Sequence, residues 1–132
     1  MMAMEVLILE SNPLHRRFLI EFLRRQPGTS LVGVAATLDE ALAICRSRRP
    51  DLVVAGLGPA PRHGLEIIRT FKDYLPQAHI VVLLDMDDER YRQAALDQGA
   101  TFCVAKTALR WQLGPTLEGL QHEATRSAGE RS

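Results

Sequence analysis

Five short runs of apolar residues recur along the 132-residue chain, and each is followed by a segment with helical periodicity. The runs are apolar throughout rather than alternating, which is typical of strands that are covered on both faces. We therefore expect five strand–helix units in succession. The predicted strands cover residues 6–9, 31–35, 52–55, 80–84 and 101–105.

Start and stop signals bound the helices between these strands. Asn12 is a suitable N-cap with Pro13 at the first helical position, and Thr37 precedes Glu40 at the spacing of a capping box. The acidic residues 87–89 suit the positive end of a helix dipole, and Gly99 is a suitable stop. The predicted helices begin near Pro13, Thr37, Leu65 and Asp87, and a last one carries Leu109, Leu113, Leu117 and Leu120.

The sequence makes a more specific prediction for three segments: the first helix, the last helix and one loop. The four-residue spacing from Leu14 through Phe18 to Phe22 predicts the buried face of the first helix, with two further leucines beside it. Pro115 restricts the last helix, whose regular part is expected to begin about one turn before it. Residues 56–64 combine three Gly with two Pro and are expected to form a loop.

Buried strands that alternate with helices predict an α/β fold: a parallel, doubly wound sheet with right-handed crossovers in a three-layer sandwich. We expect one domain over residues 1–123. Residues 124–132 are rich in Ser, Gly, Arg and Glu and are expected to form a disordered tail or the start of a linker. In such folds ligands bind at the carboxyl ends of the strands. That rule selects six positions: Glu10, Ser11, Gly56, Leu84, Asp85 and Lys106.

The charge balance narrows the classes of function. Lys and Arg number 16, as do Asp and Glu, so the formal net charge is zero. A nucleic-acid binder or a polybasic membrane-surface protein would show an excess of basic residues. No apolar run approaches the roughly 20 residues of a membrane span, and the first residues lack the features of a signal peptide. We expect a cytoplasmic domain that binds neither nucleic acid nor membrane by itself.

Cysteine and histidine form no recognisable metal or redox motif. Cys45 and Cys103 lie in apolar surroundings without CxxC spacing, so we expect buried free thiols. The four histidines share no spacing and are expected at the surface: His15, His63, His79 and His122.

The order and spacing of several segments resemble the receiver domain of bacterial two-component response regulators, the CheY-like family. Residues 6–13 match its first strand and acidic pair, and residues 50–57 match its third strand. Residues 64–66 match the next helix start, and residues 99–106 match the fifth strand and its lysine. The resemblance covers residues 5 to about 123 and implies a flavodoxin-like (βα)5 sandwich with strand order 2-1-3-4-5.

The resemblance also implies roles for single positions. In that family an acidic pair binds Mg²⁺, an Asp that ends the third strand accepts a phosphoryl group, and a Thr or Ser ends the fourth strand. A Lys ends the fifth strand, with a switch aromatic three residues before it. In this chain the acidic pair is Glu10 and Ser11, the acceptor position is Gly56, the Thr position is Leu84, the aromatic position is Cys103 and the lysine is Lys106.

Most of these substitutions remove the chemistry. Gly56 has no carboxylate to form an acyl phosphate, and Leu84 cannot donate a hydrogen bond to a phosphoryl oxygen. Glu10 with the neutral hydroxyl of Ser11 offers few ligands for Mg²⁺. We therefore expect a degenerate receiver that has no metal or other cofactor and no enzymatic activity.

The remaining charges predict an ion pair. A pocket with three carboxylates and one lysine would be negative and would attract a cation, whereas Glu10 and Lys106 alone balance each other. We expect Lys106 to form a static salt bridge with Glu10, or with Asp85 just past the end of the fourth strand.

These observations predict a phosphorylation-independent interaction or dimerisation module in bacterial signal transduction. The resemblance favours contact with a protein partner or a second copy through the fourth helix, fifth strand and fifth helix, at residues 88–98 and 102–118. Two alternatives stay open: a small-molecule site in the pocket vacated at Gly56, and phosphorylation of a relocated acceptor, Asp85. The candidate interface residues are Trp111, Leu113, Arg110 and Arg92.

Overall fold

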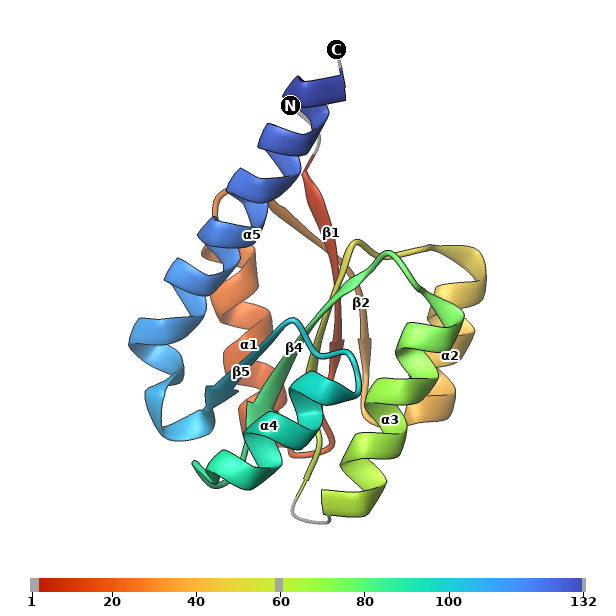
Figure 1. The fold of residues 1–132 in the computed structure, drawn as a ribbon, viewed down its shortest axis with the longest axis vertical. Coiled ribbons are helices and arrows are strands. Elements are labelled where there is room, and N and C mark those ends of the chain that lie inside the picture. Colours follow the sequence, from red (N-terminus) through yellow and green to blue (C-terminus); the bar gives the residue numbers. More distant parts are fainter. Residues whose placement is uncertain (1–2, 59–60, 132) are drawn as a thin grey trace.

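The computed structural model describes the backbone of residues 3–58 and 61–131, and the side chains of these residues except Pro61 and residues 124–131. Strands and helices alternate from one end to the other, as the apolar pattern predicts (Figure 1). In chain order the elements are β1 (Met4–Leu9), α1 (Pro13–Arg25), β2 (Thr29–Ala35), α2 (Leu38–Ser47), β3 (Leu52–Gly56), α3 (Pro61–Tyr74), β4 (His79–Leu84), α4 (Glu89–Asp97), β5 (Phe102–Ala105), a 3₁₀ turn (Lys106–Ala108) and α5 (Leu109–Arg131).

The five strands form one parallel sheet in the order β2-β1-β3-β4-β5. The predicted α/β class, parallel sheet and strand order are therefore confirmed. Helices α1 and α5 cover one face of the sheet, and α2, α3 and α4 cover the other (Figure 1). Because all strands point the same way, their carboxyl ends meet along one edge of the sheet.

Burial on both faces explains why the strands are apolar without alternation. In β1, Leu7 and Leu9 pack against α2 and α3, while Val6 and Ile8 pack against α1 and α5. Successive side chains of a strand point to opposite faces, so each face of a central strand needs its own apolar set. The core therefore consists of two layers with the sheet between them.

The predicted capping signals are present in the structure. The Asn12 side chain accepts hydrogen bonds from the backbone N–H groups of Leu14 and His15, at 2.9 and 3.2 Å. Thr37 accepts from the Glu40 N–H at 3.2 Å. Gly99 ends α4 with a φ of 116°, a left-handed conformation that favours glycine. These local signals set where the helices leave the edges of the sheet.

The buried face of α1 differs from the prediction. Leu14 is 78% exposed, and the fully buried side chains are Leu19 and Leu23, with Phe18 and Phe22 only partly covered. A step of four residues advances about 40° beyond a full turn, so a stripe at this spacing drifts around the helix. Leu14 lies in the first turn, beyond the part of α1 that packs on the sheet.

The loop predicted at residues 56–64 is shorter, because α3 begins at Pro61. Proline is favoured in the first turn of a helix, where its missing N–H has no partner to lose. Gly64 lies inside α3 and is buried, and a Cβ there would collide with the side chains of Tyr91 and Leu57. Two residues typical of loops thus belong to a closely packed helix.

Helix α5 is longer than predicted at both ends. It starts at Leu109, after the 3₁₀ turn, and contains Pro115 in its interior. Pro115 and Trp111, one turn before it, both lie on the exposed side, so water can bind the carbonyl that proline leaves unpaired. The backbone remains helical through Arg131, although a disordered tail was the expectation for residues 124–132; the side chains of that segment lie outside the described residues. Among the described helices, none is long and apolar enough to span a bilayer.

Candidate functional site

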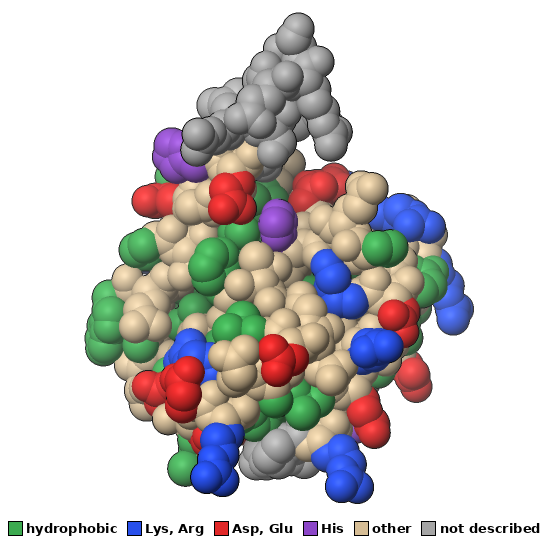
Figure 2. All heavy atoms as spheres, in the orientation of Figure 1, with side chains coloured by type: hydrophobic (Ala, Val, Ile, Leu, Met, Phe, Trp, Pro, Cys, Tyr) green, Lys and Arg blue, Asp and Glu red, His purple; other side chains and the backbone are tan. Residues whose placement is uncertain are grey.

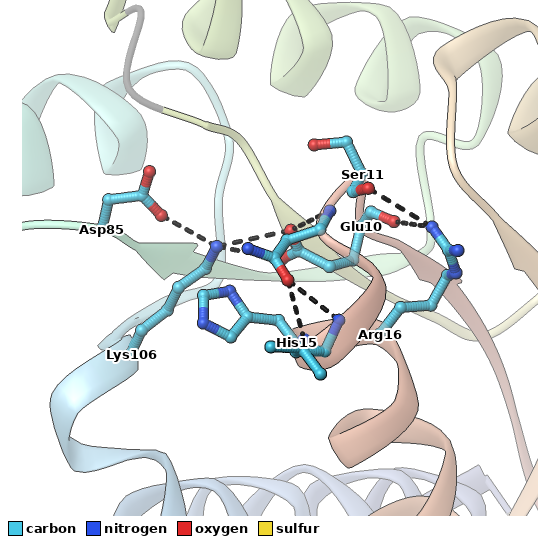
Figure 3. A network of polar contacts seen from close by, with 8 residues as sticks. Glu10, Ser11, His15, Arg16, Asp85 and Lys106 are labelled. Carbon is cyan, nitrogen blue, oxygen red and sulfur yellow. Dashed lines mark hydrogen bonds and ion pairs between the residues drawn. The ribbon is translucent and has the colours of Figure 1, made fainter.

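Three charged side chains converge where β1, β4 and β5 end (Figure 3). Glu10 follows β1, Asp85 follows β4 and Lys106 follows β5. The parallel register places these strand ends at one edge, with β3 and Gly56 between β1 and β4. Topology therefore brings together residues that lie far apart in the sequence.

Lys106 lies between the two carboxylates. Its Nζ is 3.1 Å from Glu10 Oε2, 3.4 Å from Glu10 Oε1 and 2.8 Å from Asp85 Oδ1. The Lys106 and Glu10 side chains are 10% and 2% exposed, whereas that of Asp85 is 33% exposed. The predicted salt bridge is confirmed, and it includes both proposed partners at once. The group carries a formal charge of −1.

The turn between β1 and α1 holds Glu10 in place. Its side-chain Oε1 accepts a hydrogen bond from the Asn12 N–H at 3.1 Å, and its own N–H donates to the Ala35 carbonyl at 3.0 Å. Arg16 donates to the Glu10 carbonyl at 3.0 Å. Hydrogen bonds to the Glu10 main chain and to its carboxylate therefore fix the orientation of this side chain.

The space above Gly56 contains the Glu10 carboxylate. A Cβ built on Gly56 would lie 2.6 Å from Glu10 Cδ and still closer to Oε2. Gly56 therefore leaves no vacant pocket of its own, and the prediction of a ligand cavity at this residue is wrong in its location. The absent side chain has been replaced by a carboxylate from the neighbouring strand.

An open cavity of about 440 Å³ lies at this edge of the sheet, and Gly56 is not among the residues that line it. His15 lies at its wall, half-buried, with an enclosed Nδ1 that has no hydrogen-bond partner, so the expectation of a surface histidine is wrong for this residue. Its position in the first turn after the β1 acid was the available signal. The cavity is lined by Glu10, Ser11, Asn12, His15, Gly58, Asp85, Lys106 and Thr107.

The other predicted pocket positions have diverse environments. Ser11 is exposed at the cavity wall, while the Leu84 side chain is buried in the core layer between the sheet and the helices α2, α3 and α4. Cys103 is buried, and its thiol donates to the Arg92 carbonyl at 3.8 Å. Burial raises the pKa of the Cys103 thiol, partly opposed by the nearby Arg92 charge. Burial raises the pKa of Cys45 as well. Both cysteines are buried free thiols, as predicted.

Tyr91 of α4 was not identified from the sequence. Its hydroxyl is enclosed without a hydrogen-bond partner near Gly64, and its ring packs against the core. Burial raises the pKa of Tyr91, and the charges of Asp85 and Cys103 raise it further. Tyr91 thus contributes an aromatic ring from α4 near Cys103, where the resemblance expects an aromatic from the fifth strand.

The charged oxygen donors at this site are the carboxylates of Glu10 and Asp85. Mg²⁺ prefers an octahedral set of oxygen ligands that usually includes carboxylates. Both carboxylates here bind the Lys106 ammonium, and the neighbouring Ser11 is neutral. Within residues 3–58 and 61–123, no three His, Cys, Asp or Glu side chains are grouped as metal ligands would be.

The predicted interface residues lie on α4 and α5, with different exposures. Trp111 is 65% exposed and Arg110 is also exposed. Leu113 is fully buried against the sheet, so its assignment to an interface is wrong; it belongs to the apolar stripe of α5. Arg92 binds Asp87 at 2.7 Å and donates to the Cys103 carbonyl at 2.6 Å, so its guanidinium is already engaged within the chain.

Two further apolar side chains are exposed on the same surface. Phe102 of the edge strand β5 is 42% exposed and Leu96 of α4 is 37% exposed. On the face shown in Figure 2, acidic and basic side chains are interspersed without a large field of one sign, in agreement with the net charge of zero. The surface of α4, β5 and α5 therefore combines mixed charge with separate apolar side chains.

Comparison with known proteins gives one family. A family model described as the response regulator receiver domain matches residues 6–116. The chain is 31% identical over 97 residues to the uncharacterized transcriptional regulatory protein YhcZ of Bacillus subtilis, a match that covers 74% of this chain and 45% of that protein. It is 30% identical over 102 residues to a protein-glutamate methylesterase/protein-glutamine glutaminase of Desulfotalea psychrophila, covering 76% of this chain and 28% of the relative. The chain thus spans less than half the length of these relatives.

Solved structures agree on the fold. A LuxR-family two-component response regulator from Aurantimonas sp. SI85-9A1 superposes with a TM-score of 0.80 at 24% identity, with 98% of each chain covered. The isolated REC domain of RcsB from Salmonella enterica serovar Typhimurium, with the phosphomimetic BeF3⁻, superposes with a TM-score of 0.82 at 20% identity, covering 91% of this chain and 89% of that one. At these identities the likeness establishes architecture alone.

Proposed function

This chain belongs to the response regulator receiver domain family of two-component signalling, and we propose that it acts without phosphorylation, as a cytoplasmic protein-interaction or dimerisation module. One observation carries the proposal. The residue that ends β3, Gly56, has no side chain, and the space above it contains a carboxylate that is bound to Lys106. A fixed ion pair therefore occupies the place where a phosphorylation switch would work.

The chemistry of phosphotransfer supports this proposal. An acyl phosphate requires a carboxylate nucleophile that the phosphodonor can reach. Glu10 is 1% exposed, and both of its oxygens face Lys106. The −1 charge of Glu10, Asp85 and Lys106 opposes the approach of an anionic phosphoryl group. These features favour a pocket that stays unphosphorylated.

A pocket that does not switch keeps the surface of α4, β5 and α5 in one conformation, which a partner can bind. The Arg92 side chain joins α4 to β5 through its hydrogen bond to the Cys103 carbonyl, and Asp85 joins the β4–α4 loop to Lys106. Trp111, Phe102 and Leu96 then offer apolar contact area around this framework. Exposed aromatic side chains are frequent anchors of protein interfaces. We assign partner or self-association to the surface of α4, β5 and α5.

A phosphodonor experiment tests the proposal. The protein is incubated with acetyl phosphate and Mg²⁺, and its intact mass is measured against a phosphorylatable receiver treated in parallel. We expect no covalent phosphoryl adduct, which would add about 80 Da. An adduct that maps to Asp85 would overturn the proposal in favour of a relocated acceptor, since Asp85 is the more exposed carboxylate of the site.

The cavity favours one alternative function, the binding of a small molecule. Its volume of about 440 Å³ lies within the usual range for ligand sites. The charge of −1 at its base selects a cationic or neutral polar ligand over an anion. Thermal shift with a metabolite panel tests this alternative: stabilisation that is lost in His15→Ala would support it, and a panel without any shift would count against it.

A further inference from the structure

We propose that Glu10 is a resident carboxylate: it replaces the side chain missing at position 56, supplies the internal counter-ion of Lys106 and favours glycine at that position. This inference rests on the proposed function and adds the group that holds the pocket in one state. Position 56, where the acceptor carboxylate is missing, is also the point at which this chain departs from an arrangement suited to a phosphoryl group.

The two positions are neighbours across the sheet. Strands β1 and β3 are adjacent, and Leu9 is paired with Ala55, so residues 10 and 56 follow that pair at the carboxyl edge. The Glu10 side chain extends over Gly56. A Cβ at position 56 would lie 2.6 Å from Glu10 Cδ and 3.2 Å from Oε1. Contacts of a Cβ below 3.0 Å essentially never occur, so any larger residue must displace the carboxylate.

The carboxylate cannot move away without losing its partners. Oε1 holds the Asn12 N–H at 3.1 Å, and Oε2 pairs with Lys106 at 3.1 Å. Glu10 is almost fully buried, so neither oxygen has solvent as a substitute. Displacement would leave a buried carboxylate and an ammonium with fewer partners, which is among the costly changes in a protein interior. A larger side chain at position 56 therefore destabilises the fold by separating Glu10 from Lys106 and from the Asn12 N–H.

The resident carboxylate also determines what Lys106 can bind. With Glu10 on one side and Asp85 at 2.8 Å on the other, the ammonium is neutralised from within the chain. An external anion must compete with both carboxylates to bind it. Restoring an aspartate at position 56 alone therefore adds a third carboxylate to a filled site, and does not by itself recreate an acceptor pocket.

A double-mutant cycle tests the proposal. Gly56→Ala is made in the native chain and in a Glu10→Ala background, and the melting temperature of all four proteins is measured. We expect Gly56→Ala to lower the melting temperature by roughly 5 °C or more in the native chain, and by less than half as much when Glu10 is already Ala. Equal losses in the two backgrounds would overturn the proposal.

Gly119→Ala is the matched control. Gly119 lies in α5 with open space around its Cβ position, so alanine should leave the melting temperature unchanged or raise it slightly. A loss as large as that of Gly56→Ala would mean that the assay responds to any glycine substitution and would remove the support from the cycle.

A second pair of variants separates the carboxylate from simple space. In the Glu10→Ala background, Gly56→Asp returns a carboxylate to the vacated space beside Lys106, whereas Gly56→Ala fills it without charge. We expect the Asp variant to melt higher than the Ala variant, and the reverse order would overturn the proposal. These proteins differ in stability whatever the phosphodonor assay finds, so failure of this proposal and failure of the proposed function are distinguishable.

Discussion

Lys106 divides its charge between two carboxylates in unlike surroundings. Glu10 is buried, while the Asp85 side chain is one-third exposed and sits at the cavity rim. The loss of one partner from a buried pair costs about 3–5 kcal/mol, whereas partly exposed pairs contribute about 1 kcal/mol or less. The two partners of one lysine should therefore differ in their effect on stability.

We expect Glu10→Gln to lower the free energy of unfolding by about 3 kcal/mol and Asp85→Asn by about 1 kcal/mol or less. Urea denaturation at neutral pH measures both variants. Equal losses would show that exposure does not separate the two pairs.

The two buried thiols should make the free energy of unfolding depend on pH in the alkaline range. Burial raises the pKa of both Cys45 and Cys103 above the ordinary value of 9.0. Because the folded protein holds these protons more tightly than the unfolded chain, their contribution is complete below about pH 9 and is lost as the pH rises through the folded-state pKa values.

Urea denaturation at about pH 7.5 and about pH 10.5 checks this dependence. The native chain should lose more stability between the two values than a variant in which both cysteines are alanine. A variant that loses as much as the native chain would assign the alkaline loss to other groups, such as Tyr91, whose pKa is also raised.

At the scale of the elements, α5 separates its core and surface roles by periodicity. Leu113 is fully buried in the stripe that faces the sheet, while Trp111, two residues earlier, is 65% exposed. On a helix, residues two apart do not share a face. The same helix can therefore stabilise the sheet and present an aromatic side chain to a partner.

Leu113→Ala should lower the free energy of unfolding by about 2–5 kcal/mol, and Trp111→Ala by about 0.5 kcal/mol or less. Thermal or urea denaturation of the two variants under the same conditions provides the comparison. A large loss for Trp111→Ala would mean that the indole supports the fold and is not free for binding.

How far the sequence predicts the elements depends on whether the signal is local. The caps at Asn12 and Thr37 were predicted correctly because they involve only neighbouring residues. The exposure of Leu14 and the start of α3 at Pro61 depend on where each helix meets the sheet, which periodicity does not contain. Elements are therefore better predicted than the faces they bury.

The same distinction applies to the site. The pairing of Lys106 with an acid followed from residue types at the strand ends. The direction of the Glu10 side chain over Gly56 is set by a rotamer and by contacts between two strands, so the sequence predicted an empty pocket where a carboxylate lies. The walls of the cavity at His15 and Thr107 become visible only when α1 and the turn after β5 are placed together.

At the scale of the whole molecule, the surface of α4, β5 and α5 is the proposed contact with a partner or a second copy. Trp111→Ala should weaken self-association or partner binding at least tenfold, while Arg46→Ala, an exposed substitution on α2, should leave it unchanged. Analytical ultracentrifugation over a concentration series measures self-association, and pull-down with a tagged chain followed by titration measures a partner. Equal effects of the two substitutions would place the interface elsewhere.

The Glu10–Lys106 contact has a consequence for the kinetics of folding. It joins residues 96 positions apart, so it closes a loop that contains most of the chain. Contacts of such long sequence separation have a large entropic cost of loop closure, and they form after the local strand–helix units. A contact that forms late slows unfolding more than it speeds folding. The ion pair at the edge of the sheet therefore extends the lifetime of the folded state, and with it the time during which a partner finds the same surface.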